Sequence, residues 1–135
     1  MPGRRNLPPQ GAPWVTLSPM EELRPIVHMV IHVLAPGAVA GTAFRERWKW
    51  AWGLMLVTML VDLDHLLADP IYDPDRCGIG FHPLHSHPAI VGYALLLLVP
   101  AVRIVAAGLL VHMAADGLDC VWQQYAAASP GRAGG

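Results

Sequence analysis

Histidine and aspartate recur in this chain at spacings that suit metal binding. Three pairs lie three or four residues apart: His28 and His32, His112 and Asp116, and Asp62 and His65. Residues three or four apart project from one side of a helix. Imidazole nitrogen and carboxylate oxygen together are a donor set that borderline divalent metals favour. The pairs therefore predict a site for one divalent ion or two adjacent ions, with zinc as the first choice and manganese or iron next.

A second concentration of polar residues lies in a short run rich in histidine and proline. The run Phe81-His82-Pro83-Leu84-His85-Ser86-His87 follows a stretch of prolines, aspartates and glycines that predicts a long loop. Ser86 lies beside two histidines, but adjacent residues give poor geometry for activating a nucleophile. We expect Ser86 to cap a helix or to hydrogen-bond at the metal site. A histidine that binds metal usually donates its other N–H to a carboxylate or carbonyl, and Asp64, Asp69 and Asp119 are candidates for that role.

The composition indicates that lipid is the solvent for most of the chain. Of its 135 residues 54% are hydrophobic and 14% are charged, about half the charged share of a soluble protein. The net charge is −1, and no long basic run is present that could neutralise phosphates. A nucleic acid is therefore not an expected partner, whereas membrane lipid is.

Four apolar segments predict an all-α, integral membrane bundle of about four transmembrane helices. They cover residues 26–44, 51–68, 88–102 and 104–122. The third segment is the shortest and contains Pro100, which predicts a tilted or kinked span. We expect a flexible leader over residues 1–19, a transmembrane helical domain over 20–125 and a flexible tail over 126–135.

Successive spans alternate in direction, and this brings the polar residues to one face. The start of the first span, the end of the second, the start of the third and the end of the fourth share that face, and all seven histidines fall there. The opposite face carries Arg45, Arg47, Lys49 and Arg103. Ionisable groups at membrane depth are costly and usually functional. The alternative is a buried hydrogen-bonded network without metal, and His28 can also be read as an ordinary histidine at the membrane interface.

The order of these motifs resembles that of the LexA-regulated, membrane-bound metal-dependent hydrolases of bacteria. The motifs are His32, Asp62-Leu63-Asp64-His65, His82-Pro83-Leu84-His85-Ser86 and His112-Met113-Ala114-Ala115-Asp116. The run from Cys77 to Ser86 is similar to that of a small bacterial membrane-protein family of unknown function. The resemblance covers residues 26–122. It implies a set of metal ligands: His32, Asp62, Asp64, His85, His112 and Asp116, with His65 and His82 behind them. Val61 stands where the larger group has a proline, and Pro83 stands where it has an arginine. An arginine at the position of Pro83 could hold a phosphate.

These patterns predict a metal-dependent hydrolase in the bacterial inner (cytoplasmic) membrane. A lipid or lipid-linked ester or phosphoester would be its substrate, and Asp64 and His85 its catalytic residues. The alternative is a non-enzymatic metal-binding membrane protein such as a sensor, carrier or accessory subunit. A transporter is less favoured because the polar residues do not line a path across the bilayer.

Two further features of the sequence bear on orientation and assembly. Cys77 and Cys120 lie on the histidine face, where they could form a disulfide if that face is outside the cytoplasm. Gly108 or Gly117 could permit close helix packing, so a homo-oligomer is left open.

Overall fold

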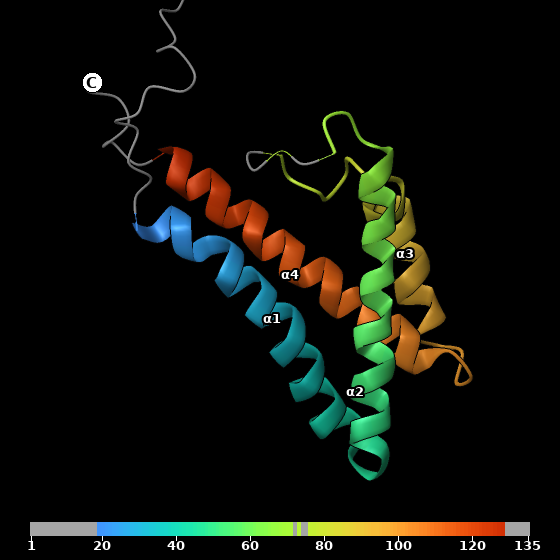
Figure 1. Ribbon diagram of the computed structural model, residues 1–135. Coiled ribbons are helices and arrows are strands. Elements are labelled where there is room, and N and C mark those ends of the chain that lie inside the picture. Colours follow the sequence, from blue (N-terminus) through green and yellow to red (C-terminus); the bar gives the residue numbers. More distant parts are fainter. Residues whose placement is uncertain (1–18, 72, 74–75, 129–135) are drawn as a thin grey trace, which may run out of the picture.

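The computed structural model describes residues 19–71, 73 and 76–128 as a set of helices (Figure 1). In chain order these are α1 (Pro19–Ala43), η1 (Arg45–Arg47), α2 (Trp48–Val57), η2 (Thr58–Leu67), η3 (Pro83–His85), α3 (His87–Leu96) and α4 (Arg103–Ala128), where η denotes a 3-10 helix. The described residues contain no strand, which confirms the all-α prediction. Residues 1–18 and 129–135, which include most of the predicted leader and tail, lie outside the described part.

Within the described residues, three helical segments are long and apolar enough to cross a membrane. They are Glu22–Ala43, Arg45–Leu67 and Arg103–Ala126. The predicted third span is different, because α3 has only 10 residues and ends at Leu96 instead of continuing to residue 102. The chain turns there through Leu97 N–H, which donates to Ala94 O, and Pro100 has no N–H with which to continue a helix. The third apolar segment is therefore helical only as far as Leu96, a shorter helix than its predicted range of 88–102.

The outer helices extend further than their apolar stretches predicted. Helix α1 begins at Pro19 instead of residue 26, and α4 continues to Ala128 instead of ending at residue 122. Their polar ends are joined by an ion pair in which Arg24 donates from Nε and Nη2 to the Asp119 carboxylate, at 2.8 and 2.7 Å. Backbone hydrogen bonding continues through these polar turns, so hydropathy underestimates the length of both helices.

The second span changes helix type midway, and this change sets the direction of its polar side chains. From Thr58 to Leu67 the backbone is a 3-10 helix, which has three residues per turn. Burial follows the same period, since Thr58, Val61 and Asp64 are buried at intervals of three. Asp62 and His65 share the neighbouring row, so this segment presents Asp64 on one side and Asp62 on another.

Helices α1, α2 and α4 pack closely at the end of the molecule opposite the histidines. Ala40, Ala51 and Met55 form a buried core there. A Cβ atom added to Gly108 of α4 would lie 2.9 Å from Met55 Cα, so glycine permits the close approach of α4 to α2. The close packing predicted at Gly108 therefore occurs between two helices of the same chain, α4 and α2.

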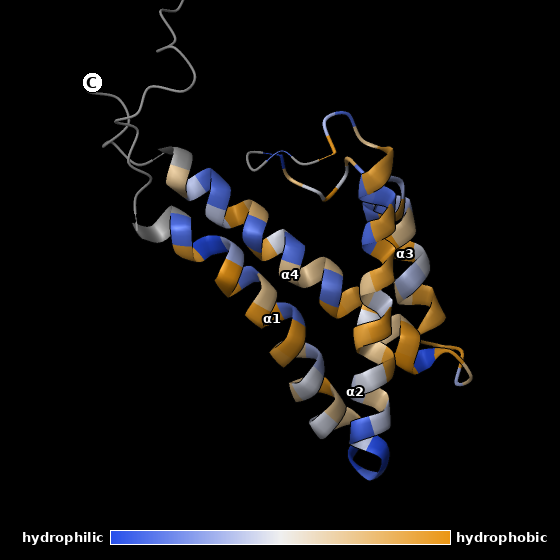
Figure 2. Ribbon diagram, viewed as in Figure 1, coloured by the Kyte–Doolittle hydropathy of each residue, from blue (hydrophilic) through white to orange (hydrophobic). Residues whose placement is uncertain are grey.

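The alternating helices bring the four predicted ends to one side of the bundle. The start of α1, the end of η2, the start of α3 and the end of α4 all lie away from the turn between α1 and α2 (Figure 1). Figure 2 shows hydrophilic residues recurring along α1 and α4, and a separate hydrophilic group at the α1–α2 turn. The fold therefore gathers histidines and aspartates from every long helix.

Candidate metal centre

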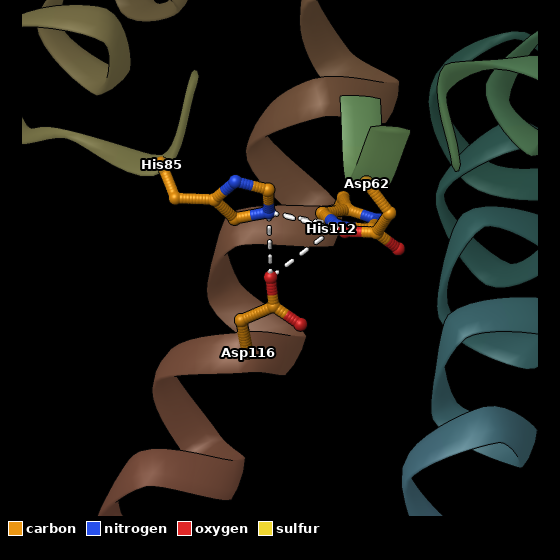
Figure 3. A group of neighbouring side chains, drawn as sticks. All are labelled: Asp62, His85, His112 and Asp116. Atoms are coloured by element: carbon orange, nitrogen blue, oxygen red, sulfur yellow. Dashed lines mark hydrogen bonds and ion pairs between the residues drawn. The ribbon is translucent and has the colours of Figure 1, made fainter. Parts of the chain in front are cut away.

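Four side chains from three elements converge on one point (Figure 3). They are Asp62 of η2, His85 of η3, and His112 and Asp116 of α4, and one donor atom of each lies within 4.8 Å of all the others. His85 Nε2 is 3.2 Å from Asp62 Oδ1 and 3.2 Å from Asp116 Oδ2. His112 Nε2 is 3.0 and 3.3 Å from the same two oxygens. The two nitrogens are 3.4 Å apart.

These separations match the edges of a metal coordination polyhedron. With metal–ligand bonds of about 2.1 Å, neighbouring ligands lie about 3.4 Å apart in a tetrahedron and about 3.0 Å apart in an octahedron. The five separations that involve a histidine nitrogen run from 3.0 to 3.4 Å, and all four donor atoms lie within 4.8 Å of one another. Two imidazoles and two carboxylates also form a donor set that suits zinc, manganese or iron. The residues therefore fit a divalent ion.

The donor atoms of this group lie so close together that several compete for the same hydrogen bonds. An imidazole nitrogen carries at most one hydrogen, yet each Nε2 faces two carboxylate oxygens and the other nitrogen. In addition, His112 Nδ1 is buried without a hydrogen-bond partner. A buried polar group without a partner is costly. A cation between the four donors would be bound by all of them as electron-pair donors, with His112 binding through Nε2 and not through its unpartnered Nδ1.

Asp64 lies behind His85 and orients it. Its Oδ2 is 3.2 Å from His85 Nδ1 and accepts a 2.8 Å hydrogen bond from the Leu84 N–H. A carboxylate behind a metal-binding histidine fixes the ring orientation and increases its basicity. Burial lowers the pKa of the His85 imidazole, but hydrogen bonds to Asp116 and two other carboxylates outweigh burial and raise this pKa to about 10. Asp64, predicted as a ligand and catalytic residue, is thus placed to position His85.

His65 and His82 form a second layer on the same side. His65 Nδ1 is 3.1 Å from Asp64 Oδ1, and the His82 ring stacks on the His65 ring with centroids 3.8 Å apart. Asp64, His65 and His85 form a possible three-donor group, whereas His82 belongs to no such group in the described part of the chain. Burial, followed by the nearby His65, lowers the pKa of His82. His82 thus contacts His65 and lies 5.9 Å from the His85 ring, centroid to centroid, outside the four-donor group.

A third layer comes from α1. His32 Nε2 is 3.0 Å from Asp116 Oδ1 and 3.0 Å from His28 Nε2. The sequence alone also allows His28 to be an ordinary histidine at the membrane interface. The structure places it in the cluster. The four-residue spacing of His28 and His32 was the signal for this contact. Of the other two aspartates considered, Asp119 binds Arg24, and Asp69 is exposed.

The central group is buried on most sides and accessible at one. His85 is 0% exposed and His112 is 3% exposed, whereas the Asp62 side chain is 43% exposed. Closed metal sites are typical of structural roles, and catalytic sites keep an accessible position. Asp62 marks the accessible edge of this group.

Two local features hold the loop that carries His85. A disulfide joins Cys77 of the loop to Cys120 of α4, as predicted. Ser86 is the N-cap of α3, where its hydroxyl oxygen accepts a hydrogen bond from the Ala89 N–H, which confirms the expected capping role. The loop is therefore attached to α4 before η3 and to α3 after it.

Comparison with known protein families gives a match over most of the chain. DUF6122, a family of unknown function, matches residues 22–123, which include every residue of the cluster. No curated protein matches the chain. No solved structure matches it either. The likeness to the LexA-regulated hydrolases stays a prediction from the motifs.

Proposed function

Because the chain belongs to the DUF6122 family, whose description assigns no function, we propose a function from the site itself. The protein is a multi-pass protein of the bacterial cytoplasmic membrane whose four helices all enter the bilayer. It binds a divalent metal, with zinc as the first choice, and hydrolyses an ester or phosphoester of a lipid or lipid-linked molecule at the membrane surface.

The observation that carries this proposal is the convergence of four donor atoms beside an accessible edge. A divalent ion in such a site lowers the pKa of a bound water and polarises a carbonyl or phosphoryl oxygen. Asp62 is the exposed carboxylate of the group, so it is placed to accept a proton from water or substrate. His85 and His112 are buried and hold the geometry, and Asp64 acts through His85.

The expected substrate class follows from the surroundings of the site. An open apolar hollow on the surface, of about 390 Å³, is lined by side chains of α2, η2, η3, α3 and α4, among them Leu54, Val57, Val61, Leu84, Tyr93 and Leu109. Val61 directly precedes Asp62, and Leu84 directly precedes His85. A hollow of this character suits an acyl chain.

A non-enzymatic metal-binding protein is the second candidate. It is favoured by the lining of the same hollow, which offers few polar groups to hold a substrate headgroup. A sensor, carrier or accessory subunit needs the donor set without a substrate site.

One experiment separates the two functions. The full chain, purified in mild detergent without chelators and loaded with zinc or manganese, is assayed on phospholipid and lipid-phosphate micelles beside Asp62→Asn. Asp69→Asn serves as the matched control, because Asp69 is exposed in the loop. Hydrolysis that is lost in Asp62→Asn and kept in Asp69→Asn supports the hydrolase. Stable metal binding with no hydrolysis in any protein would favour the non-enzymatic function.

A further inference from the structure

Asp116 presents its two carboxylate oxygens to two different groups of histidines. Oδ2 faces His85 and His112, at 3.2 and 3.3 Å. Oδ1 faces His32 at 3.0 Å and His28 at 3.5 Å. The carboxylate therefore lies between the central group and the pair on α1.

The pair on α1 has ligand geometry of its own. His28 Nε2, His32 Nε2 and Asp116 Oδ1 are separated by 3.0 to 3.5 Å, the range of neighbouring ligands around a metal. His32 is 3% exposed, and the side chain of His28 is 29% exposed. Such a set has three protein donors and an accessible side, the composition of a site that keeps water as a further ligand.

On α1, two neighbours compete for the one hydrogen that His32 Nε2 can carry. His32 Nε2 faces both His28 Nε2 and Asp116 Oδ1 at 3.0 Å. If that nitrogen carries its hydrogen it can donate to one of them, and if it does not it faces the carboxylate with a lone pair. A cation beside these three atoms removes this competition, because all of them can then act as electron-pair donors.

We infer that the protein holds two divalent ions, bridged by Asp116. One ion is bound by Asp62, His85, His112 and Asp116 Oδ2, and the second by His28, His32 and Asp116 Oδ1. Ions that share a bridging ligand lie about 3.5 to 4 Å apart in two-metal hydrolytic sites. This inference rests on the proposed function and deepens it, since two ions held by these residues would supply charge to both the attacking and the leaving oxygen of a phosphoester.

Metal content of the purified protein tests the inference. We expect two manganese or zinc ions per chain in the wild-type protein, one in His28→Gln, and two in His87→Ala, a control outside both ligand groups. His28→Gln is chosen because His28 is the most exposed donor of the pair and its amide replacement keeps a side chain of similar reach. Size-exclusion elution in detergent checks that each variant remains folded.

Magnetic coupling between two bound manganese ions tests independently whether Asp116 bridges them. In the manganese-loaded wild-type protein, two ions that share Asp116 should give the exchange-coupled spectrum of a pair, and His28→Gln should give that of an isolated ion. One ion in the wild-type protein, or two ions unchanged in His28→Gln, would overturn the two-ion centre while leaving the proposed function in place. No bound metal in the wild-type protein would overturn both.

Discussion

At the residue scale, the aspartates of this site divide into those that face the metal position and one that stabilises a ligand. Asp62 and Asp116 each place a carboxylate oxygen 3.0 to 3.3 Å from the Nε2 atoms of both His85 and His112. Asp64 is buried and lies against the opposite nitrogen of His85. The two aspartates of the Asp-x-Asp motif, Asp62 and Asp64, therefore have different roles.

The role of Asp64 predicts a graded loss of affinity. Asp64→Asn keeps the shape of the side chain but removes the negative charge behind His85. We expect metal affinity to fall by about 10- to 100-fold, the usual effect of losing such a partner, with the number of ions per chain unchanged at saturation. Chelator competition measures the affinity, and Asp69→Asn is the control. Loss of all binding would instead make Asp64 a direct ligand, and unchanged affinity would remove its role.

The raised pKa of His85 predicts a pH dependence of metal binding. This pKa is about 10 in the metal-free protein, so the ring is protonated at neutral pH and must release a proton when a metal binds. Apparent affinity should therefore rise as pH increases from 6 to 8, by roughly tenfold per unit for each proton released. Titration calorimetry in buffers of different ionisation enthalpy counts the protons. Binding that is independent of pH would contradict this protonation state.

At the element scale, the 3-10 segment determines how the second span contributes to the site. With three residues per turn, Asp62 and His65 form one row and Thr58, Val61 and Asp64 form another. This register lets Asp64 reach the back of His85 while Asp62 stays at the accessible edge. The close approach of α4 at Gly108 fixes the start of the segment, because an added Cβ would lie 2.9 Å from Thr58 Oγ1.

Gly108→Ala should destabilise the bundle. The added methyl group would also lie 2.9 Å from Met55 Cα, so α4 must move away from α2, at a cost of about 1–3 kcal/mol. Gly117→Ala in the same helix is the matched control, since its Cβ would meet no heavy atom within 4 Å. Thermal unfolding in detergent should show a lower midpoint for Gly108→Ala than for Gly117→Ala. Equal midpoints would mean that α4 accommodates the methyl group without strain.

The sequence predicted which residues come together at the site better than it predicted how they are arranged within it. Spacing and alternating spans were enough to bring His32, Asp62, His85, His112 and Asp116 together, because both depend only on helix period and connectivity. The place of Asp64 behind His85 depends on a 3-10 register that the apolar pattern does not distinguish from an α-helix. The short α3 depends on the turn after Leu96, which hydropathy alone did not reveal.

At the scale of the whole molecule, the disulfide and the charged residues favour the same orientation of the protein in the membrane. Cys77–Cys120 lies on the side of the bundle that carries the cluster, and disulfides persist in oxidising compartments. Arg45, Arg47 and Lys49 concentrate positive charge at the opposite turn, and positively charged turns favour the cytoplasm. The candidate metal centre is therefore expected to face outward from the cytoplasm.

Single introduced cysteines can test this orientation, because the described part of the native chain has no free thiol. Asp69→Cys lies in the loop on the cluster side, and Glu46→Cys lies in the turn between α1 and α2, and both positions are exposed. A membrane-impermeant maleimide should label Asp69→Cys in intact spheroplasts, and Glu46→Cys only after the membrane is permeabilised. The opposite pattern would place the cluster in the cytoplasm, where the Cys77–Cys120 bond would face a reducing environment. Labelling of the unmodified protein before and after reduction completes the test, since thiols that react without reduction would contradict the disulfide on which the orientation rests.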